Sequence, residues 1–343
     1  MKALVFYEHG TLDNVVYTDI PDPEIGADEV LVQIKAAALN RLDLWVLEGW
    51  RGLSLKLPHV MGSDGAGVIT AVGPQVTQFA VGDRVAINPT LSCGICHFCQ
   101  TGRDNLCDTF ALLGEHEPGF FAEYAVVPAR NLLHMPHTAT FAAAAAASLV
   151  YVTAWHSLIE RGGLQAGESV LIVGAGGGVN SASIQIARLA GAGPIYVVGS
   201  DDEKLARAQE LGADVLINRH HEEWGKAVFK ATKRQGVDVV VDNVGAATYF
   251  ASLRSLKKGG RLLTVGNTSG AQFEFDNRYM FSKQISIIGS SMGTIADYER
   301  VMGLVFNGRL QPVIDSTFPL SDGLTALHRL QENNVMGKLV LQP

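Results

Sequence analysis

Residues 169–199 read SVLIVGAGGGVNSASIQIARLAGAGPIYVVG, and this stretch decides the fold of the second half of the chain. An apolar run, SVLIVG, passes through a glycine-rich turn into NSASIQIARLAG, where apolar residues recur at helical spacing, and PIYVVG returns to a strand pattern. Continuous apolar strands that alternate with helices are typical of a parallel sheet covered on both faces. The stretch therefore predicts a β–α–β unit.

The rest of the chain divides around this unit. Further strand patterns (DVLIN, VDVVVDNVG, GRLLTVG and QISIIGS) extend a doubly wound parallel sheet over residues 151–290. Residues 1–150 instead show short β-rich runs separated by Pro, Gly and Asp turns, which predict an antiparallel or barrel-like domain. Residues 291–343 contain two helical stretches and a last strand, GKLVLQP, and we expect them to return to the first domain. The fold class is α/β.

The glycine turn is a candidate dinucleotide site. Glycine lets the backbone approach a pyrophosphate, and the following helix N-terminus offers free N–H groups. Read strictly as Gly-x-Gly-x-x-Gly the motif fails, because Val179 stands at the last glycine position and a frame one residue longer ends on Asn180. An ordinary tight strand–helix turn stays open as an alternative. The candidate pyrophosphate-binding residues are Gly174, Gly176, Gly177, Gly178 and Val179.

The segment after the next strand bears on the form of nicotinamide cofactor. An acidic residue there would bond the ribose of NAD and repel the extra phosphate of NADP. Gly199, Ser200 and Lys204 resemble a pocket for the 2′-phosphate, whereas Asp201 or Asp202 would oppose it. The pattern favours NADP(H) over NAD(H). The alternative is that these charges only solvate the start of a helix.

All four cysteines fall in one stretch, SCGICHFCQTGRDNLC, at positions Cys93, Cys96, Cys99 and Cys107. Four thiolates at short spacing suit one tetrahedral Zn²⁺, and four protein ligands leave no open position for a substrate. We therefore expect one structural zinc per chain, whose ligation contributes on the order of 10 kcal/mol to local folding. An iron–sulfur run would continue with a fourth Cys after three residues, followed by Pro, but seven residues intervene here. Two disulfides are the other alternative, and no secretory signal supports them.

Composition excludes several classes of protein. The formal net charge of −7 disfavours nucleic-acid partners. The most apolar stretch, residues 141–150, is far shorter than the ~20 residues that a membrane span needs, so we expect no membrane segment. The start, MKALVFYEHG, alternates like a strand rather than resembling an export signal. We expect a cytoplasmic protein that acts on a small molecule.

Three motifs together resemble the medium-chain dehydrogenase/reductase superfamily over essentially the whole chain. They are GSDGAGVITAVG with VGDRVAI (residues 62–87), the Cys-x2-Cys-x2-Cys-x7-Cys lobe at residues 90–110, and the β–α–β unit. The resemblance implies a GroES-like β-barrel-type catalytic domain at residues 1–150 and 291–343. It also implies a Rossmann NAD(P)-binding domain at 151–290, and assembly into a homodimer or homotetramer through the Rossmann sheets.

The departures from the superfamily pattern concern its catalytic zinc. Where zinc alcohol dehydrogenases carry a Cys, a His–Glu pair and a further Cys or acidic residue, this chain carries Asn40, Ser63 with Asp64, and Leu149. The usual catalytic zinc is therefore expected to be absent. An atypical metal site near Asn40, Ser63 and Asp64 stays open, with Asp43 and His59 as further ligands. Glu115-His116 is a second candidate pair, whereas His220-His221 are expected at the surface.

Asn40 with Asp43, and Tyr151 with Thr153, instead resemble the zinc-independent quinone oxidoreductases of the superfamily. The resemblance implies hydride transfer between NAD(P)H and a quinone, an enone, or an aldehyde/alcohol pair, with substrate oxygen polarised by hydrogen-bond donors. The candidate catalytic residues are Asn40, Asp43, Tyr151 and Thr153. The carry-over also places along the cofactor cleft the residues Gly245, Gly266, Ser290, Met292 and Lys338, each with a structural alternative.

Two other functions stay open. The first is an NAD(P)-dependent alcohol dehydrogenase with an atypical metal site. The second, of another class, is a nucleotide-binding sensor or structural protein without catalysis.

Overall fold

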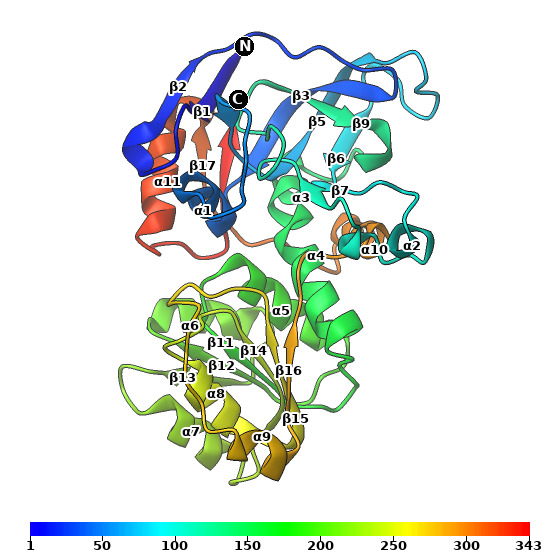
Figure 1. Cartoon of the computed structure of the whole chain (residues 1–343). Coiled ribbons are helices and arrows are strands. Elements are labelled where there is room, and N and C mark those ends of the chain that lie inside the picture. Colours follow the sequence, from blue (N-terminus) through cyan, green and yellow to red (C-terminus); the bar gives the residue numbers. More distant parts are fainter. The chain divides into compact units, whose positions relative to one another are not determined.

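A computed structural model describes all 343 residues and divides them into two compact units. The first unit comprises Met1–Leu149 and Thr294–Pro343, and the second comprises Val150–Gly293. Figure 1 shows that the chain leaves the first unit once and returns to it with its last segment, so the two termini lie in the same unit. The sequence predicts boundaries between the two domains near residues 150 and 290, and the structure divides the chain after Leu149 and after Gly293.

The first unit is built mainly from antiparallel strands. A seven-stranded sheet has the order β10-β6-β5-β3-β18-β17, with β9 pairing β3 as well, and a three-stranded sheet has the order β2-β1-β4. The long strand β3 pairs with β5 along its length and with β18 at its end. The strands are β1 (Lys2–Phe6), β2 (Val15–Asp19), β3 (Glu29–Ala38), β4 (His59–Val60), β5 (Asp64–Val72), β6 (Arg84–Ile87), β7 (Thr90–Leu91), β8 (Ala111–Leu112), β9 (Tyr124–Pro128), β10 (Leu132–His134), β17 (Ile314–Pro319) and β18 (Lys338–Gln342).

Helices of this unit pack on the sheet through small or apolar residues. Helix α3 carries a run of buried alanines, which lets its backbone lie close to strands β3 and β5. The alternating burial of β3 explains why its sequence reads apolar at every second residue, since neighbouring side chains point to opposite faces. The helices are α1 (Arg41–Glu48), α2 (His97–Gln100), α3 (Phe141–Ser148), α10 (Ile295–Phe306) and α11 (Gly323–Gln331).

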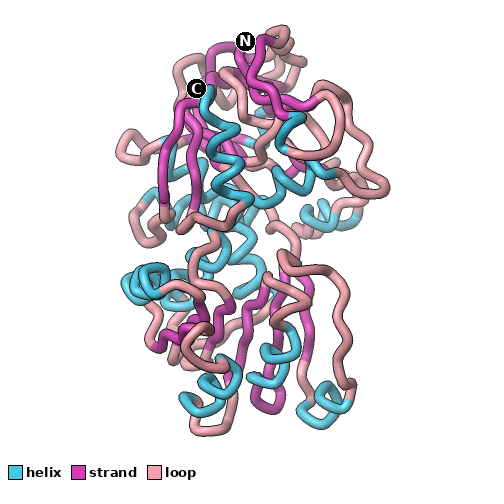
Figure 2. The backbone as a smooth tube through the Cα atoms, turned by 90° about the vertical axis from the view of Figure 1, so that its left-hand side faces the viewer, coloured by secondary structure: helices cyan, strands magenta, loops and turns pink.

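The second unit holds a six-stranded, all-parallel sheet in the order β13-β12-β11-β14-β15-β16. In Figures 1 and 2 its strands lie side by side in the centre of the unit and its helices lie outside them. The elements are α4 (Val150–Trp155), β11 (Val170–Val173), α5 (Gly178–Leu189), β12 (Ile195–Gly199), α6 (Asp202–Glu210), β13 (Val215–Asn218), α7 (Trp224–Ala231), β14 (Val237–Asp242), α8 (Tyr249–Ser255), β15 (Leu256–Thr264), α9 (Arg278–Lys283) and β16 (Ser286–Gly289).

This topology confirms the α/β class and the doubly wound sheet predicted from the apolar strands. Strands β11 and β14 are buried along their whole length, apart from one half-buried residue, as a central parallel strand must be. The strand order reverses at β11, because β12 and β13 lie on one side of it and β14 to β16 on the other. Ligands of such sheets bind beyond the carboxyl ends of the strands at this reversal. The turn that follows β11 is the glycine turn.

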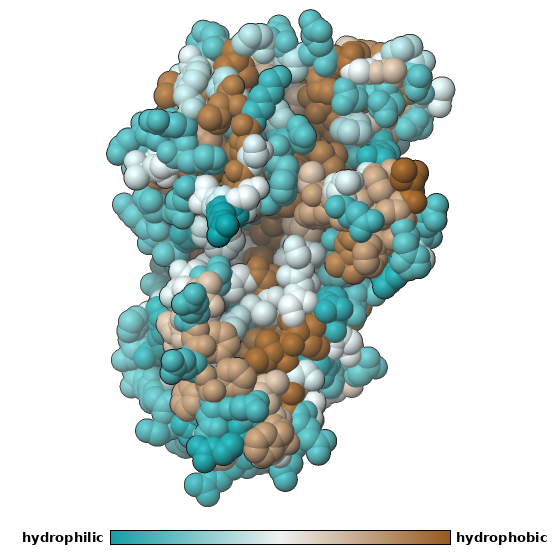
Figure 3. Space-filling view, in the orientation of Figure 1, coloured by the Kyte–Doolittle hydropathy of each residue, from teal (hydrophilic) through white to brown (hydrophobic).

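On the face shown in Figure 3, apolar areas of each unit are bordered by hydrophilic side chains. None of the helices taken singly has the length and hydropathy of a membrane span. Helix α3 and the segment Val150–Arg161 reach them only when they are joined across a break.

Candidate functional site

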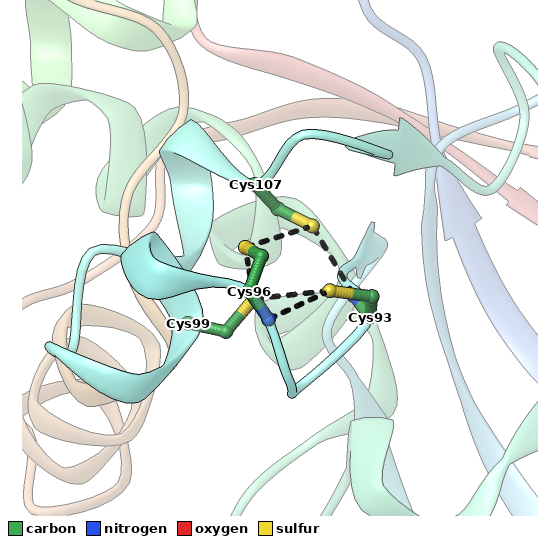
Figure 4. A group of neighbouring side chains, drawn as sticks. All are labelled: Cys93, Cys96, Cys99 and Cys107. Atoms are coloured by element: carbon green, nitrogen blue, oxygen red, sulfur yellow. Dashed lines mark hydrogen bonds between the residues drawn. The ribbon is translucent and has the colours of Figure 1, made fainter.

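The four cysteines converge on one point (Figure 4). Cys96 immediately precedes helix α2, Cys99 lies within it, and Cys107 follows a short 3-10 turn. Their sulfur atoms all lie within 4.8 Å of one another, with separations of 3.6 Å for Cys96–Cys99 and 3.9 Å for Cys93–Cys99 and Cys96–Cys107. A tetrahedral zinc at ~2.3 Å from each sulfur requires separations of about 3.8 Å, so the residues present fit this ion. A disulfide would need ~2.05 Å.

The surrounding backbone favours thiolates at two of the four positions. The N–H of Cys93 donates to Cys107 Sγ at 3.2 Å, and chiefly for this reason the pKa of Cys107 is lowered to about 6. The pKa of Cys99 is raised to about 11 by burial and by the neighbouring thiols. Four sulfurs so close cannot all ionise without a cation between them. The arrangement of the four sulfur atoms therefore suits a positive ion bound between them.

A second cluster, of polar and charged residues, is buried in the first unit and consists of Asn40, Asp43, Asp64 and Lys338, here called the Lys338 cluster. The sheet register creates it: Ala38 of β3 pairs with Asp64 of β5 on one side and with Val340 of β18 on the other. Asn40 follows β3 directly, and Lys338 begins β18. Three adjacent strands thus bring these side chains to one end of the sheet. None is more than 5% exposed.

Lys338 is the hub of this cluster. Its ammonium donates to Asn40 Oδ1 at 2.5 Å and to Asp64 Oδ2 at 2.9 Å. The amide of Asn40 donates to Asp64 Oδ2 at 2.9 Å and to the carbonyl of Ala38 at 3.3 Å. The amide of Asn40 is thus occupied inside the protein. The sequence suggested that Lys338 meets the cofactor or is a solvated strand end. The structure gives it a buried carboxylate partner, which excludes the solvated strand end.

The two carboxylates of the cluster share one cation. Asp43 accepts a hydrogen bond from the backbone N–H of Asn40 at 2.7 Å, while its Oδ1 makes none. Burial raises the pKa of Asp43 to about 7, against the opposing effects of the Asn40 N–H and the Lys338 charge. Burial likewise raises the pKa of Asp64, and Lys338 opposes this most. A buried pair of acids beside one ammonium therefore holds a proton more readily than an exposed pair would.

We expect Asp43→Asn to change how stability depends on pH. Burial raises the pKa of Asp43 in the folded state from its ordinary value of 3.8 to about 7, so the folded state keeps a proton that the unfolded chain releases between these pH values. The unfolding free energy of the wild type should therefore fall relative to that of the variant from pH 4 to pH 7, by roughly 3–4 kcal/mol, and then level off. Urea unfolding of both proteins at intervals of half a pH unit measures this. A constant difference would contradict it.

The positions of the superfamily's catalytic zinc do not fit a metal in this arrangement. Asp64 Oδ2 already accepts from Lys338 and Asn40, Leu149 offers no donor atom, and Ser63 Oγ makes no hydrogen bond. His59 is buried in β4, where its ring packs at 5.3 Å from Phe6 and its Nε2 lies 3.3 Å from the carbonyl of Gly114. The ammonium of Lys338 lies between Asn40 and Asp64, the two residues whose oxygen atoms could otherwise bind a metal cation.

Two further histidine candidates have structural roles or lie at the surface. His116 Nδ1 accepts the N–H of Leu112 at 3.2 Å and lies 3.6 Å from Glu115, so the pair closes a turn after β8. Burial raises the pKa of Glu115. His220 and His221 are exposed in the turn after β13, as the sequence indicated.

The second unit holds the other predicted catalytic residues. Tyr151 is fully buried on α4, where its hydroxyl accepts from Gln185 of α5 at 2.8 Å. Thr153 Oγ1 lies 3.7 Å from Met292 Sδ, so these two predicted site residues do meet. Asn40, Asp43 and Lys338 belong to the first unit.

The remaining predicted cofactor residues lie in loops that follow the parallel strands. Gly245, after β14, has a φ of +95°, and a side chain there would strike the carbonyl of Gly270. The carbonyl of Gly266 accepts from the Thr264 hydroxyl at 3.3 Å, and the N–H of Ser290 donates to the Thr264 carbonyl at 3.0 Å. These loops therefore occupy the edge of the sheet at which a dinucleotide binds.

An asparagine holds the glycine turn in place. Gly174 has a φ of +108°, and Asn180 Nδ2 lies where a side chain at Gly174 would project, donating to the carbonyls of Val173 and Gly174 at 3.0 Å. Asn180 Oδ1 accepts from Asn243, whose own Oδ1 accepts the N–H of Val265. Two amide side chains thus tie together the loops after β11, β14 and β15. In the sequence Asn180 stands out only as a departure from the motif. Asn243 was not among the predicted site residues, although its place directly after a buried strand is a signal that could have identified it.

We expect Asn180→Ala to weaken nicotinamide binding by about tenfold, because the turn loses the hydrogen bonds that hold its carbonyls. The dissociation constant from fluorescence titration measures this. Exchange of the exposed, neighbouring-helix residue Gln209→Ala serves as the control and should leave binding unchanged. Equal affinity for Asn180→Ala and the wild type would show that the glycines hold the turn unaided.

The end of β12 presents a glycine where an acidic residue would reach the ribose. A side chain at Gly199 would come within 2.9 Å of Leu205 and 3.0 Å of Ala175. The carboxylate of Asp201 accepts the N–H of Lys204 at the start of α6, and Asp202 accepts from Asn218. The N–H of Arg219 donates to the Gly199 carbonyl at 2.9 Å, which places this arginine beside the same strand end.

Comparison with known proteins agrees with this architecture. Residues 26–137 match the alcohol dehydrogenase GroES-like domain, and residues 178–307 match the zinc-binding dehydrogenase model. An acryloyl-coenzyme A reductase of Metallosphaera sedula is 32% identical, with 99% of each chain covered. An NAD-dependent alcohol dehydrogenase of Sulfolobus acidocaldarius is 32% identical, over 100% of this chain and 99% of its own.

A solved structure of an NAD-dependent alcohol dehydrogenase superposes with a TM-score of 0.96, at 42% identity, with both chains fully covered. These relatives carry both units, so the likeness extends to the whole chain. The predicted resemblance is confirmed. The match to the zinc-binding dehydrogenase model and the NAD-dependent relatives support zinc and a nicotinamide as the cofactors of this chain. The chain belongs to the zinc-type alcohol dehydrogenase family of the medium-chain dehydrogenase/reductase superfamily and is an NAD(P)-dependent oxidoreductase.

Proposed function

We propose that this enzyme reduces the carbon–carbon double bond of an enone or an enoyl thioester. The observation that carries the proposal is the Lys338 ammonium, buried among the groups that replace the ligands of a catalytic zinc. Bound NAD(P)H would supply the hydride to the β-carbon. The electron pair of the double bond then moves toward the carbonyl oxygen, where a positive charge stabilises it, and the α-carbon takes a proton from water. Acryloyl-coenzyme A reductases among the relatives act on a compound of this class.

In this proposal Lys338 polarises the substrate oxygen, a role for which the sequence pointed to Asn40 and Tyr151. The amide N–H groups of Asn40 donate to Asp64 and to Ala38, so Asn40 holds the cluster in place. Lys338 has three N–H donors, of which Asn40 and Asp64 take two. The third N–H is the donor for the substrate oxygen. Thr153 remains the residue proposed to lie near the nicotinamide, whereas the Tyr151 hydroxyl accepts a hydrogen bond from Gln185.

Turnover separates the proposal from its rivals. Purified enzyme is assayed with crotonyl-CoA, methyl vinyl ketone, a benzoquinone and a series of primary alcohols, each with both nicotinamides. Reduction of the enoyl substrates at least about 100-fold faster than alcohol oxidation supports the proposal. Faster alcohol oxidation would favour a true alcohol dehydrogenase, as the NAD-dependent relatives suggest. No turnover together with tight nicotinamide binding would favour a sensor.

For the cofactor, we propose a preference for NADP(H). Gly199 provides no acidic side chain at the strand end, and Ser200, Lys204 and Arg219 lie close to it in the chain or the sheet. Helix α6 begins beside it and offsets part of the Asp201 charge. The kcat/KM for NADPH divided by that for NADH tests this preference. A ratio below one would overturn it and would indicate a preference for NADH, as the names of the NAD-dependent relatives suggest.

For the metal, we propose that the zinc of the cysteine lobe is structural only, since four sulfur ligands complete its shell.

For assembly, we propose a homodimer or homotetramer through the second unit. Strand β16 is the edge of its parallel sheet and is half exposed, which leaves backbone groups free to pair with another copy. Light scattering coupled to gel filtration measures the mass of the protein in solution, and the mass of a monomer would contradict the proposed assembly.

A further inference from the structure

The cysteine lobe contacts a helix through one buried carboxylate. Asp104 lies between Cys99 and Cys107, in the 3-10 turn Asp104–Leu106, and is only 6% exposed. Its two oxygens lie 3.0 and 3.3 Å from the backbone nitrogen of Ile295, the first residue of helix α10. The lobe and the start of α10 are 191 residues apart in the sequence. The metal-binding lobe thus supplies a hydrogen-bond acceptor to the end of a distant helix.

The contact completes the N-terminus of α10. The first N–H groups of a helix have no partner within it and need external acceptors. Thr294 accepts from the N–H of Asp297, and Asp297 accepts from the N–H and the hydroxyl of Thr294. These bonds leave the N–H of Ile295 for Asp104, whose negative charge also suits the positive end of the helix.

The first turn of α10 carries Tyr298 toward the Lys338 cluster. Tyr298 is almost completely buried, and its hydroxyl lies 3.5 Å from Ser148 Oγ, which donates to the carbonyl of Ala144 in helix α3. Burial raises the pKa of Tyr298, and the charge of Asp64 adds to this effect. Asp64 in turn responds to the backbone N–H of Leu149, the residue after Ser148. Helix α3 packs against α10 and also against β5, which begins with Asp64, and against β18, which begins with Lys338. It therefore links the first turn of α10 to the strands that carry the cluster.

We propose that the cysteine lobe positions the Lys338 cluster through helix α10, with Asp104 as the positioning residue. This inference rests on the proposed function only for its effect on turnover. While the metal holds Cys99 and Cys107 together, Asp104 between them is held against Ile295. Loss of the metal or of the carboxylate releases the first turn of α10, and Tyr298 then no longer packs in one place beside Ser148 and helix α3, which contacts β5 and β18.

Hydrogen exchange tests the structural part without any need for turnover. Asp104→Ala should speed exchange of the amides of residues 295–298 by about fivefold, the loss expected for one helix cap. Asp104→Asn keeps an acceptor oxygen and should largely preserve protection. Asp108→Ala is the matched control, because Asp108 carries the same charge in the same lobe but is exposed. Unchanged exchange in Asp104→Ala, or equal effects of both alanine variants, would overturn the proposal. If Asp104→Ala does not fold, Asp104→Asn and chelation of zinc from the wild type provide the same comparison.

Kinetics tests whether the effect passes through Tyr298. Asp104→Ala with one zinc per chain should lower kcat about fivefold, with KM nearly unchanged, and the same change in a Tyr298→Phe background should add little. Additive losses would show that Asp104 acts elsewhere. If the enzyme turns over none of the substrates tested, the proposed function fails while the exchange experiment still decides the role of Asp104.

Discussion

Replacement of Lys338 by Met is expected to lower kcat/KM for an enoyl substrate by about 100-fold or more and to destabilise the folded protein by about 3–5 kcal/mol. Met has nearly the volume of the lysine stem but no charge. Removal of the ammonium leaves Asp64 buried with an uncompensated charge, and an unpaired buried charge costs far more than the net value of the pair. The same change removes the donor that we assign to the substrate oxygen.

A second variant separates the two effects. Lys338→Met combined with Asp64→Asn removes both charges, so it should recover much of the stability while kcat/KM stays low. Lys56→Met, at an exposed position of the same unit, is the matched control and should change neither quantity. Urea unfolding and steady-state kinetics on the four proteins provide the measurements. Recovery of kcat/KM in the double variant would show that Lys338 only neutralises Asp64.

Replacement of Cys107 by Ser is expected to reduce bound zinc from one per chain to nearly none and to unfold the lobe. A serine hydroxyl does not ionise at neutral pH, whereas the zinc shell needs four thiolates, and the binding free energy of a structural zinc is on the order of 10 kcal/mol. The lobe has little core of its own, since Cys96, Cys99 and His97 are only half-buried or exposed. Metal analysis and thermal unfolding with limited proteolysis of residues 93–107 measure the two effects.

The controls for this variant use the same lobe. Thr101→Ala, at an exposed position of the loop, should keep one zinc and the melting temperature of the wild type. Two zinc ions per wild-type chain, with one kept by Cys107→Ser, would contradict the assignment of the Lys338 cluster as a site that does not take a metal. Full zinc content in Cys107→Ser would contradict four-sulfur ligation itself.

Local features of the chain could be predicted because the physics behind them is local. The alternation of apolar strands and helices in residues 169–199 reflects a parallel sheet that is buried on both faces, and the structure has these elements at the same places. The four cysteines lie within 15 residues, so their spacing alone brings their sulfur atoms near one metal. Candidate residues in the glycine turn follow from the same local geometry.

The partners of single polar side chains could not be predicted in this way. The family resemblance placed Lys338 along the cofactor cleft, yet its partner Asp64 is 274 residues away in the sequence. Asn180 looked like a defect in a glycine motif, but its side chain fills the space above Gly174 and meets Asn243 from another loop. Asp104 lies among the cysteines in the sequence and was not predicted to have a role. Only the folded chain brings it within hydrogen-bond distance of Ile295 at the start of α10.

The sequence alone thus determined the element types, the doubly wound sheet, the superfamily and the four-sulfur centre. These features depend on apolar periodicity and on short spacings, which involve only residues that are close together in the sequence. Only the tertiary structure decided which buried groups share a charge. The register of β3 with β5 and β18 brings one ammonium between an amide and a carboxylate. In a buried site, the free energy of each charge depends on its nearest partner in space, and the chain must fold before that partner exists.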